Sequence, residues 1–222
     1  MRILAVTPIA VPDNELARRQ QRYNRLAPAN IKVLLHNLGT GPEVPRALEN
    51  DADIAASEAA VTAWFAAADV RNADAFLPDC VLDPGVGPGA PAQQRPVLGL
   101  LRLASGFLAA TGSSLGAVAR NGAIAGELER KLATYGTGPL HEPVSVLDLS
   151  LAAVADDAEW SGAVATALKR MTAEYVLNAC SAVNLTGQGS GGPVLVDPTA
   201  LALHLAGLLE RQRHGLPGRV PA

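Results

Sequence analysis

The two cysteines are the residues of this chain whose type and position suggest chemistry. Cys80 follows the apolar stretch AFLP and opens the turn CVLDPGV, and Cys180 ends the stretch EYVLNAC just before Ser181. A thiol has an ordinary pKa of about 8.5, so modest help makes it a base at neutral pH. Two thiols on opposite faces of a substrate can invert a stereocentre, because a thiolate removes a proton from carbon and the opposite thiol returns one.

Other roles for two cysteines have to be weighed against this one. A buried, inert thiol is the commonest state of a single cysteine. A structural disulfide is disfavoured in the cytoplasm, which is the compartment we expect here. A metal site would need further ligands at close spacing, and none of the four histidines lies next to either cysteine in the sequence. A cysteine nucleophile would need a nearby base such as histidine, and none is evident.

The elements that must position the cysteines alternate between apolar strands and helices. This alternation favours parallel sheets with helices on both faces, an α/β fold. Asp13 is the expected cap of the first helix. The sequence predicts strands at 3–6, 31–35, 74–78, 96–100, 114–119, 144–149, 176–179 and 193–196. It predicts helices at 14–26, 52–67, about 101–110, 122–135, 161–175 and 198–213.

The order of these elements repeats along the chain. Ile3 corresponds to Leu115 and Cys80 to Cys180, and the segments that begin at Pro96 and Pro193 share the letters PVL. An internal repeat favours two similar lobes related by a pseudo-twofold axis, which we place at 1–98 and 99–222, with the C-terminal helix a candidate to complete the first lobe. Ligands of parallel sheets bind at the carboxyl ends of strands, so both thiols are expected in one cleft between the lobes.

The segment Cys80 to Val86 resembles the cysteine turn of the hydantoin and allantoin racemase branch of the Asp/Glu/hydantoin racemase superfamily. The opening MRILAVTP, the Gly41-Pro42 turn, Cys180-Ser181-Ala182 and the closing PVLVDPTALAL extend the resemblance over nearly the whole chain. The resemblance implies a two-lobed α/β fold, no cofactor, a homo-oligomer, and Cys80 and Cys180 as the acid and base. It also implies a pocket for a small-molecule substrate, lined by Pro8, Val81, Leu82, Ser181 and Ala182.

The sequence differs from this branch in ways that bear on the substrate. The first strand runs into apolar Pro8-Ile9-Ala10, Gly99 is followed by two leucines, and no histidine follows Cys180 closely. These differences favour a pocket more apolar than one built for aspartate or glutamate. We expect a cofactor-independent racemase or epimerase that acts next to a carbonyl, on a hydantoin-like or amino-acid-derived molecule.

Two alternatives stay open. One is a related decarboxylase or cis–trans isomerase, although a decarboxylase of this superfamily resembles a one-cysteine design and two thiols disfavour it. The other is a binding protein that kept the fold and lost the chemistry.

Composition restricts the partners. The net charge of -3 gives no reason to expect nucleic acid or an anionic membrane. Pro8 interrupts the short apolar N-terminus, which we interpret as a strand, and no window reaches the roughly 18 apolar residues of a membrane helix. The glycines at 85–90 and 187–192 lack the Gly-Lys-Ser/Thr of a phosphate loop, and we expect them to flank the cleft. Asp83 is expected to cap its own turn.

Overall fold

A computed structural model of the chain describes residues 1–185, 192–213 and 215, and within them two parallel sheets form. The first sheet has the order β2–β1–β3, with β1 at Arg2–Val6, β2 at Lys32–His36 and β3 at Ala75–Pro78. The second has the order β5–β4–β6–β7, with β4 at Leu115–Ala119, β5 at Ser145–Val146, β6 at Tyr175–Asn178 and β7 at Val194–Val196.

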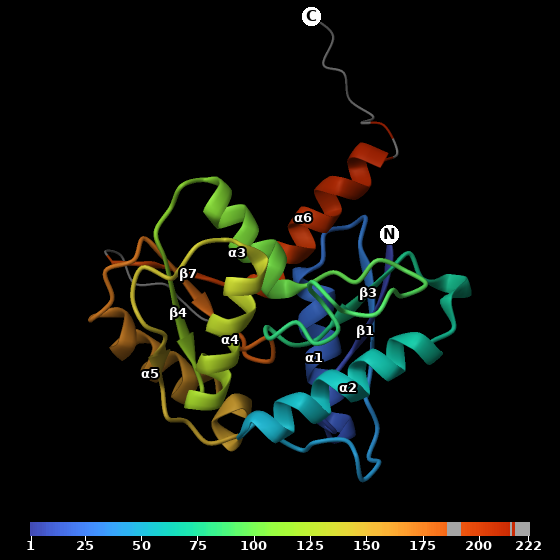
Figure 1. Cartoon of the computed structure of the whole chain (residues 1–222), viewed down its shortest axis with the longest axis horizontal. Helices are drawn as coiled ribbons and strands as arrows, with labels where there is room; N and C mark the ends of the chain where they lie inside the picture. Colours follow the sequence, from blue (N-terminus) through green and yellow to red (C-terminus); the bar gives the residue numbers. More distant parts are fainter. Residues whose placement is uncertain (186–191, 214, 216–222) are drawn as a thin grey trace, which may run out of the picture.

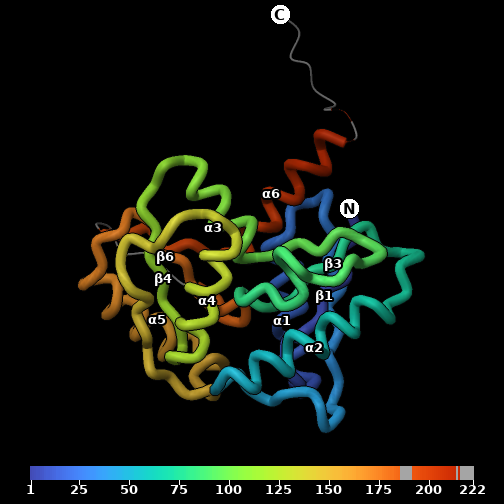
Figure 2. Tube along the Cα trace, viewed as in Figure 1, coloured from blue at the N-terminus to red at the C-terminus, as the bar shows by residue number. Residues whose placement is uncertain are grey.

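Helices flank both sheets. In Figures 1 and 2, α1 and α2 lie with β1 and β3, whereas α4 and α5 lie with β4. The bounds are Asp13–Leu26 for α1, Asp51–Ala67 for α2, Leu100–Ala110 for α3, Gly122–Tyr135 for α4, Asp157–Leu168 for α5 and Pro198–Arg213 for α6. Short 3-10 helices occupy Val70–Asn72 and Ala152–Ala155. The predicted α/β fold with parallel sheets between helices is confirmed.

The two sheets share a strand order and a register. Ile3 of β1 pairs with Ala75 of β3, and Leu115 of β4 pairs with Tyr175 of β6. Three residues further along each pair, β3 ends at Pro78 and β6 ends at Asn178. The chain therefore leaves β3 and β6 at matching positions, each two residues before a cysteine.

Four sequence predictions about single elements were wrong. The strand expected at 144–149 is confined to Ser145–Val146, because Asp148 has a positive φ of 51°, which interrupts the extended backbone. The strand expected at 96–100 is reduced to one bridge between Phe76 and Val97, because Pro96 has no N–H to donate and α3 begins at Leu100. The helix expected at 161–175 starts and ends earlier, because Asp156 caps its N-terminus and Tyr175 already belongs to β6. The N-cap of α1 is Pro12 and not Asp13, which lies inside the first turn.

The C-terminal helix packs away from the sheet that precedes it. Although α6 follows β7 of the second sheet, its residues Ala202, Leu203 and Ala206 are buried with Ile3 and Tyr23 of the first lobe. Figure 1 shows α6 (red) leaving the second sheet and running beside α3 towards the N-terminus. The division of the chain at 98/99 stays a prediction, but α6 shares a core with the first sheet.

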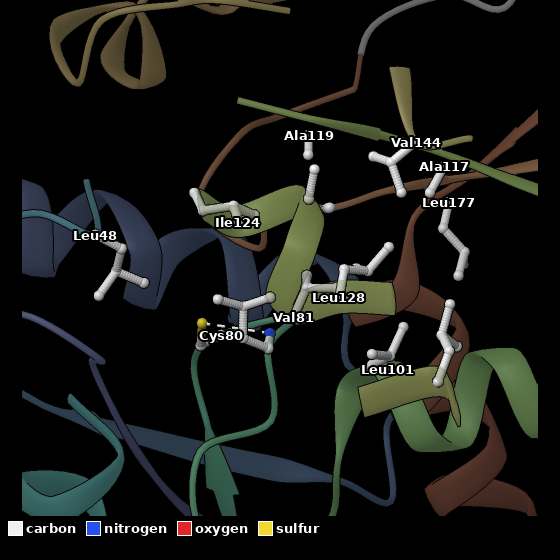
Figure 3. Packing of buried hydrophobic residues seen from close by; sticks show 14 of the residues in the cluster. Leu48, Cys80, Val81, Leu101, Ala117, Ala119, Ile124, Leu128, Val144 and Leu177 are labelled. Atoms are coloured by element: carbon white, nitrogen blue, oxygen red, sulfur yellow. Dashed lines mark hydrogen bonds between the residues drawn. The ribbon is translucent and has the colours of Figure 1, made fainter. Parts of the chain in front are cut away.

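A separate apolar cluster joins the two sheets. It combines Leu48, Val81 and Leu82 from the first half of the chain with Ile124 and Leu128 of α4. Cys80 lies at its border (Figure 3). No helix among the described residues is long and apolar enough to cross a membrane.

Candidate active site

Both cysteines line one small cavity, which we call the cysteine cavity. Its volume is about 70 Å³. All seven residues predicted for the site line it, namely Pro8, Cys80, Val81, Leu82, Cys180, Ser181 and Ala182. Cys80 is buried, at 8% exposure, Cys180 is half-buried, and both thiols are free. The structure thus brings the two cysteine turns to a common opening.

Each thiol accepts a hydrogen bond from the backbone two residues later. The N–H of Leu82 donates to Cys80 Sγ at 3.4 Å (dashed line in Figure 3), and the N–H of Ala182 acts on Cys180 by lowering the pKa of that thiol. Such turns follow naturally when an apolar strand ends and the chain must satisfy its first free N–H groups. The equivalent positions of the cysteines in the sequence therefore become equivalent local geometry.

The two thiols differ in the charges around them. Burial raises the pKa of Cys80 to about 12, and the negative charges of Asp79 and Asp83 raise it further, opposed mainly by the N–H of Leu82. Burial also raises the pKa of Cys180, but there the N–H of Ala182 and the guanidinium of Arg19 oppose the effect. Burial thus favours the protonated thiol at both positions, and Cys180 has the environment that better tolerates a thiolate.

A buried ion pair borders the cavity, and sequence reasoning missed this pair. Arg19 Nη1 donates to Asp79 Oδ2 at 3.1 Å, and the hydroxyl of Tyr23 donates to Asp79 Oδ1 at 2.8 Å. Glu15 Oε1 accepts from Arg19 Nε at 2.6 Å. Glu15, Arg19 and Tyr23 follow one another at intervals of four on α1, which places them on one helix face. That spacing, together with an aspartate directly after an apolar strand, was the available signal.

Arg120 is the second cation on the cavity wall. It follows β4 and donates from Nη2 to the carbonyl of Leu48 at 2.9 Å, while Nη1 lies 2.9 Å from Glu49 Oε1. Each of the two arginines that line the cysteine cavity is therefore already paired with a carboxylate. The cavity carries no uncompensated cation among its described lining residues.

The second cysteine turn is fixed from two directions. Asn178, at the end of β6, donates from Nδ2 to the carbonyl of Cys180 at 2.7 Å and accepts from Trp160 Nε1 at 3.0 Å. From the first lobe, Arg22 Nε donates to the carbonyl of Ser181 at 3.0 Å. Because Asn178 and Trp160 are fully buried, the backbone at Cys180 has little freedom to move.

Asp83 was expected to cap its own turn, but its side chain caps α3 instead. Its carboxylate oxygens accept from the N–H groups of Leu101 and Arg102 at 3.1 and 2.8 Å. The residue has a positive φ of 50°, which directs the chain towards this helix. Burial raises the pKa of Asp83 to about 6. Asp83 does not line the cysteine cavity, so its role is to hold the turn that carries Cys80.

A larger, open cavity of about 560 Å³ adjoins the cysteine cavity. The two share Ile9, Arg19, Leu151 and Val154 as lining residues. In the described part of the chain, no three His, Cys, Asp or Glu side chains are grouped to hold a metal ion. Residues 187–191 of the second glycine-rich segment lie outside the described residues.

The chain is similar to known proteins in its three-dimensional structure. No family model matches the sequence, and no curated protein matches it. An allantoin racemase from Klebsiella pneumoniae superposes with a TM-score of 0.74 and 17% identity, over 96% of this chain and 89% of that chain. An allantoin racemase from Pseudomonas fluorescens gives 0.73 and 16%, over 100% of both chains. An aspartate racemase from Picrophilus torridus gives 0.64 and 14%, over 95% of both. This agrees with the resemblance drawn from the cysteine turns, and the chain has the α/β fold of the allantoin and aspartate racemases.

Proposed function

We propose that the protein is a cofactor-independent racemase or epimerase that uses Cys80 and Cys180 as its acid and base. The observation that carries this proposal is the common cavity lined by both thiols, each from an equivalent turn at the carboxyl end of a parallel strand. The structural likeness to racemases of two substrate types supports the reaction class. The expected homo-oligomer stays a prediction.

The chemistry balances without a further reagent. A thiolate at Cys180 removes the proton from a carbon next to a carbonyl, so that the C–H bond breaks and an S–H bond forms. The electron pair moves to the carbonyl oxygen as an enolate, and Cys80 donates its proton to the opposite face of the carbon. Cys80 is then the thiolate, and the reverse reaction begins from that state. Another turnover in the same direction needs proton exchange with water.

Cys180 is assigned as the first base because of its surroundings. The guanidinium of Arg19 and the N–H of Ala182 lower its pKa against the effect of burial. Cys80 faces the negative charges of Asp79 and Asp83 instead, which suits a group that must hold its proton until the enolate forms.

The backbone N–H groups of Val81 and Ser181 are the donors that we propose for the enolate oxygen. Val81 and Ser181 line the cavity directly after the cysteines, and neither N–H donates to another residue within the described chain. Donors aimed at the oxygen where negative charge develops stabilise the transition state more than the ground state. One donor from each turn fits a planar intermediate held between the two thiols.

The compensated arginines favour an uncharged substrate. A dicarboxylate such as aspartate would bring two negative charges into a cavity whose cations are already paired, beside Leu82, Ile124 and Val154. Burying an unpaired charge is costly, whereas a neutral ring carbonyl loses little hydration. We therefore propose a hydantoin-like substrate rather than an acidic amino acid.

Hydrogen exchange in D₂O tests the proposal. A panel of single enantiomers of 5-substituted hydantoins and amino acids is incubated with the protein, and chirality and deuterium content are followed by chiral chromatography with mass detection. We expect inversion with uptake of one deuterium for a hydantoin. Cys80→Ser and Cys180→Ser should each abolish inversion, and each should retain slow exchange of only one enantiomer, the two variants choosing opposite ones.

The outcomes separate the alternatives. If the protein releases CO₂ from a malonate-type acid and only one of the cysteines is required, the protein is a decarboxylase and not a racemase. A rise in melting temperature with a hydantoin, without exchange, would point to a binding protein. Exchange that survives in the double cysteine variant would overturn the two-thiol mechanism.

A further inference from the structure

Asp79 lies between the two cysteine turns. It directly precedes Cys80, and its backbone carbonyl accepts from the hydroxyl of Ser181, which directly follows Cys180, at 2.9 Å. Its side chain is 1% exposed and lines the cysteine cavity. A carboxylate held there acts on both thiols from close range.

Two groups of α1 hold this carboxylate in place. Arg19 Nη1 lies 3.1 Å from Asp79 Oδ2, with only 7% of its side chain exposed, and the hydroxyl of Tyr23 lies 2.8 Å from Oδ1. Arg19 keeps a second carboxylate partner, Glu15, on its Nε. The two oxygens of Asp79 therefore face a cation on one side and a neutral donor on the other.

A structural ion pair is the simpler interpretation, and the chain contains one for comparison. One turn further along α1, Arg22 Nη2 lies 2.7 Å from Asp197 Oδ2 and ties α1 to the start of α6. Neither of these residues lines the cysteine cavity. A buried ion pair contributes little net stability, so stability alone does not explain why α1 carries the Arg19–Asp79 pair in addition to Arg22–Asp197. What distinguishes Arg19 and Asp79 is that both border the thiols.

We propose that the Asp79–Arg19 pair, held by Tyr23, decides which cysteine removes the first proton. Arg19 and Asp79 are positioning residues in this proposal: Arg19 stabilises a thiolate at Cys180, and Asp79 keeps Cys80 protonated. The inference rests on the proposed two-cysteine reaction, and it gives that reaction a preferred starting state.

The charges that face each thiol support this assignment. Cys180 faces Arg19 and Arg22 of α1 and Asp79, and the two arginines lower its pKa while Asp79 raises it. Cys80 faces Asp79, Asp83 and Cys180, all of which raise its pKa. The effect of Asp79 is thus offset by arginines at one thiol and reinforced by a second carboxylate at the other. Tyr23 stays protonated beside Asp79, since burial raises its pKa well above the ordinary range.

The test measures the ionisation of each thiol separately and needs no substrate. Cys80→Ser leaves Cys180 to be followed, and Cys180→Ser leaves Cys80, by the rate of alkylation with iodoacetamide as a function of pH. We expect a lower midpoint for Cys180 than for Cys80. Adding Asp79→Asn to Cys180→Ser should lower the midpoint of Cys80 by one to three pH units, about what a neighbouring charge produces. Adding Arg19→Gln to Cys80→Ser should raise the midpoint of Cys180.

Asp197→Asn is the matched control. It removes the carboxylate of an ion pair on the same helix, and its amide oxygen can still accept from the N–H groups of Thr199 and Ala200. A midpoint shift for Cys80 in Asp79→Asn no larger than in Asp197→Asn would overturn the proposal. So would equal midpoints for the two thiols in the otherwise unchanged protein.

Two further measurements keep the test decisive. If Asp79→Asn does not fold, Tyr23→Phe removes only the neutral donor, and it should raise the midpoint of Cys80, because the hydroxyl dipole then no longer offsets the negative charge of Asp79. No shift in Tyr23→Phe would then count against the proposal. Failure of the proposed function has a different signature, the absence of deuterium uptake in the unchanged protein, whereas the thiol midpoints report on the charge pair alone.

Discussion

The hydroxyl of Tyr135 donates to Asp83 Oδ2 at 3.0 Å and so joins the turn after Cys80 to the end of α4. Asp83 belongs to the first half of the chain and Tyr135 to the second. The same carboxylate caps α3, the helix that links the two sheets. The position of Cys80 therefore depends on contacts with two helices, α3 and α4.

Replacing Asp83 by asparagine should change how stability depends on pH. The pKa of Asp83 is raised from 3.8 to about 6 by burial, so the folded protein binds this proton more tightly than the unfolded chain. The contribution of Asp83 to the free energy of unfolding is present at low pH and is lost as pH rises from about 4 to about 6. A shift of roughly two units corresponds to about 3 kcal/mol. Urea unfolding at pH 4 and pH 7 should show Asp83→Asn gaining that much relative to the unchanged protein.

Tyr135→Phe is the companion variant. It removes a donor that stabilises the ionised carboxylate, so the pKa of Asp83 should rise further and the loss of stability should extend to higher pH. An unchanged pH dependence in both variants would mean that Asp83 titrates as an ordinary surface carboxyl.

Gly99→Ala should destabilise the protein and disturb the cysteine turn. A Cβ at Gly99 would overlap the carboxylate of Asp83 and come within 3.0 Å of Val86 Cγ1. Both atoms belong to the turn that carries Cys80, so the turn must shift. Overpacking of this kind costs about 1–3 kcal/mol. Gly106 in the same helix has open space at its Cβ position, and Gly106→Ala should instead stabilise by about 0.5–1 kcal/mol. Thermal unfolding that orders the two variants the other way would contradict the packing.

The sequence predicted the architecture because its apolar strands are bounded by clear breaks. Helices 122–135 and 198–213 were predicted with the bounds that the structure has, since Asn121 and Asp197 precede good helix formers. The strand at 96–100 failed because a run of apolar residues is equally typical of the start of a buried helix, which is what Leu100 and Leu101 form.

The site was predictable where it follows from strand ends and was missed where it depends on a helix face. Cys80 and Cys180 could be placed together because the carboxyl ends of parallel strands mark ligand sites. Arg19 and Asp79 were missed because an arginine on a polar helix is normally solvated. The spacing of Glu15, Arg19 and Tyr23 marks one face of α1, but only the tertiary contact of Arg19 with Asp79, directly after β3, buries that guanidinium.

Trp160→Phe should loosen the second cysteine turn. The mutation removes the donor to Asn178 Oδ1 and leaves a buried amide oxygen unpaired, which costs about 1–3 kcal/mol. Asn178 also holds the carbonyl of Cys180, so alkylation of Cys180 should become faster at a fixed pH. Leu168, half-buried at the end of the same helix, offers a control: Leu168→Ala should lower stability without accelerating alkylation. Equal alkylation rates in Trp160→Phe and the unchanged protein would show that this chain of contacts does not position Cys180.

Proton exchange should become faster as pH rises above neutrality. Because burial raises the pKa of both thiols above the ordinary range, only a small fraction of Cys180 is ionised at pH 7. At pH values below the pKa of the base, an increase of one pH unit raises the thiolate fraction about tenfold. The deuterium-uptake rate should therefore increase about tenfold per pH unit between pH 7 and pH 9. Initial rates measured over this range at constant ionic strength give the slope directly. A rate that is already constant at pH 7.5 would contradict this expectation, and it would mean that the bound substrate lowers the pKa of a thiol. The slope should then appear only in kcat/KM, which reports on the free protein.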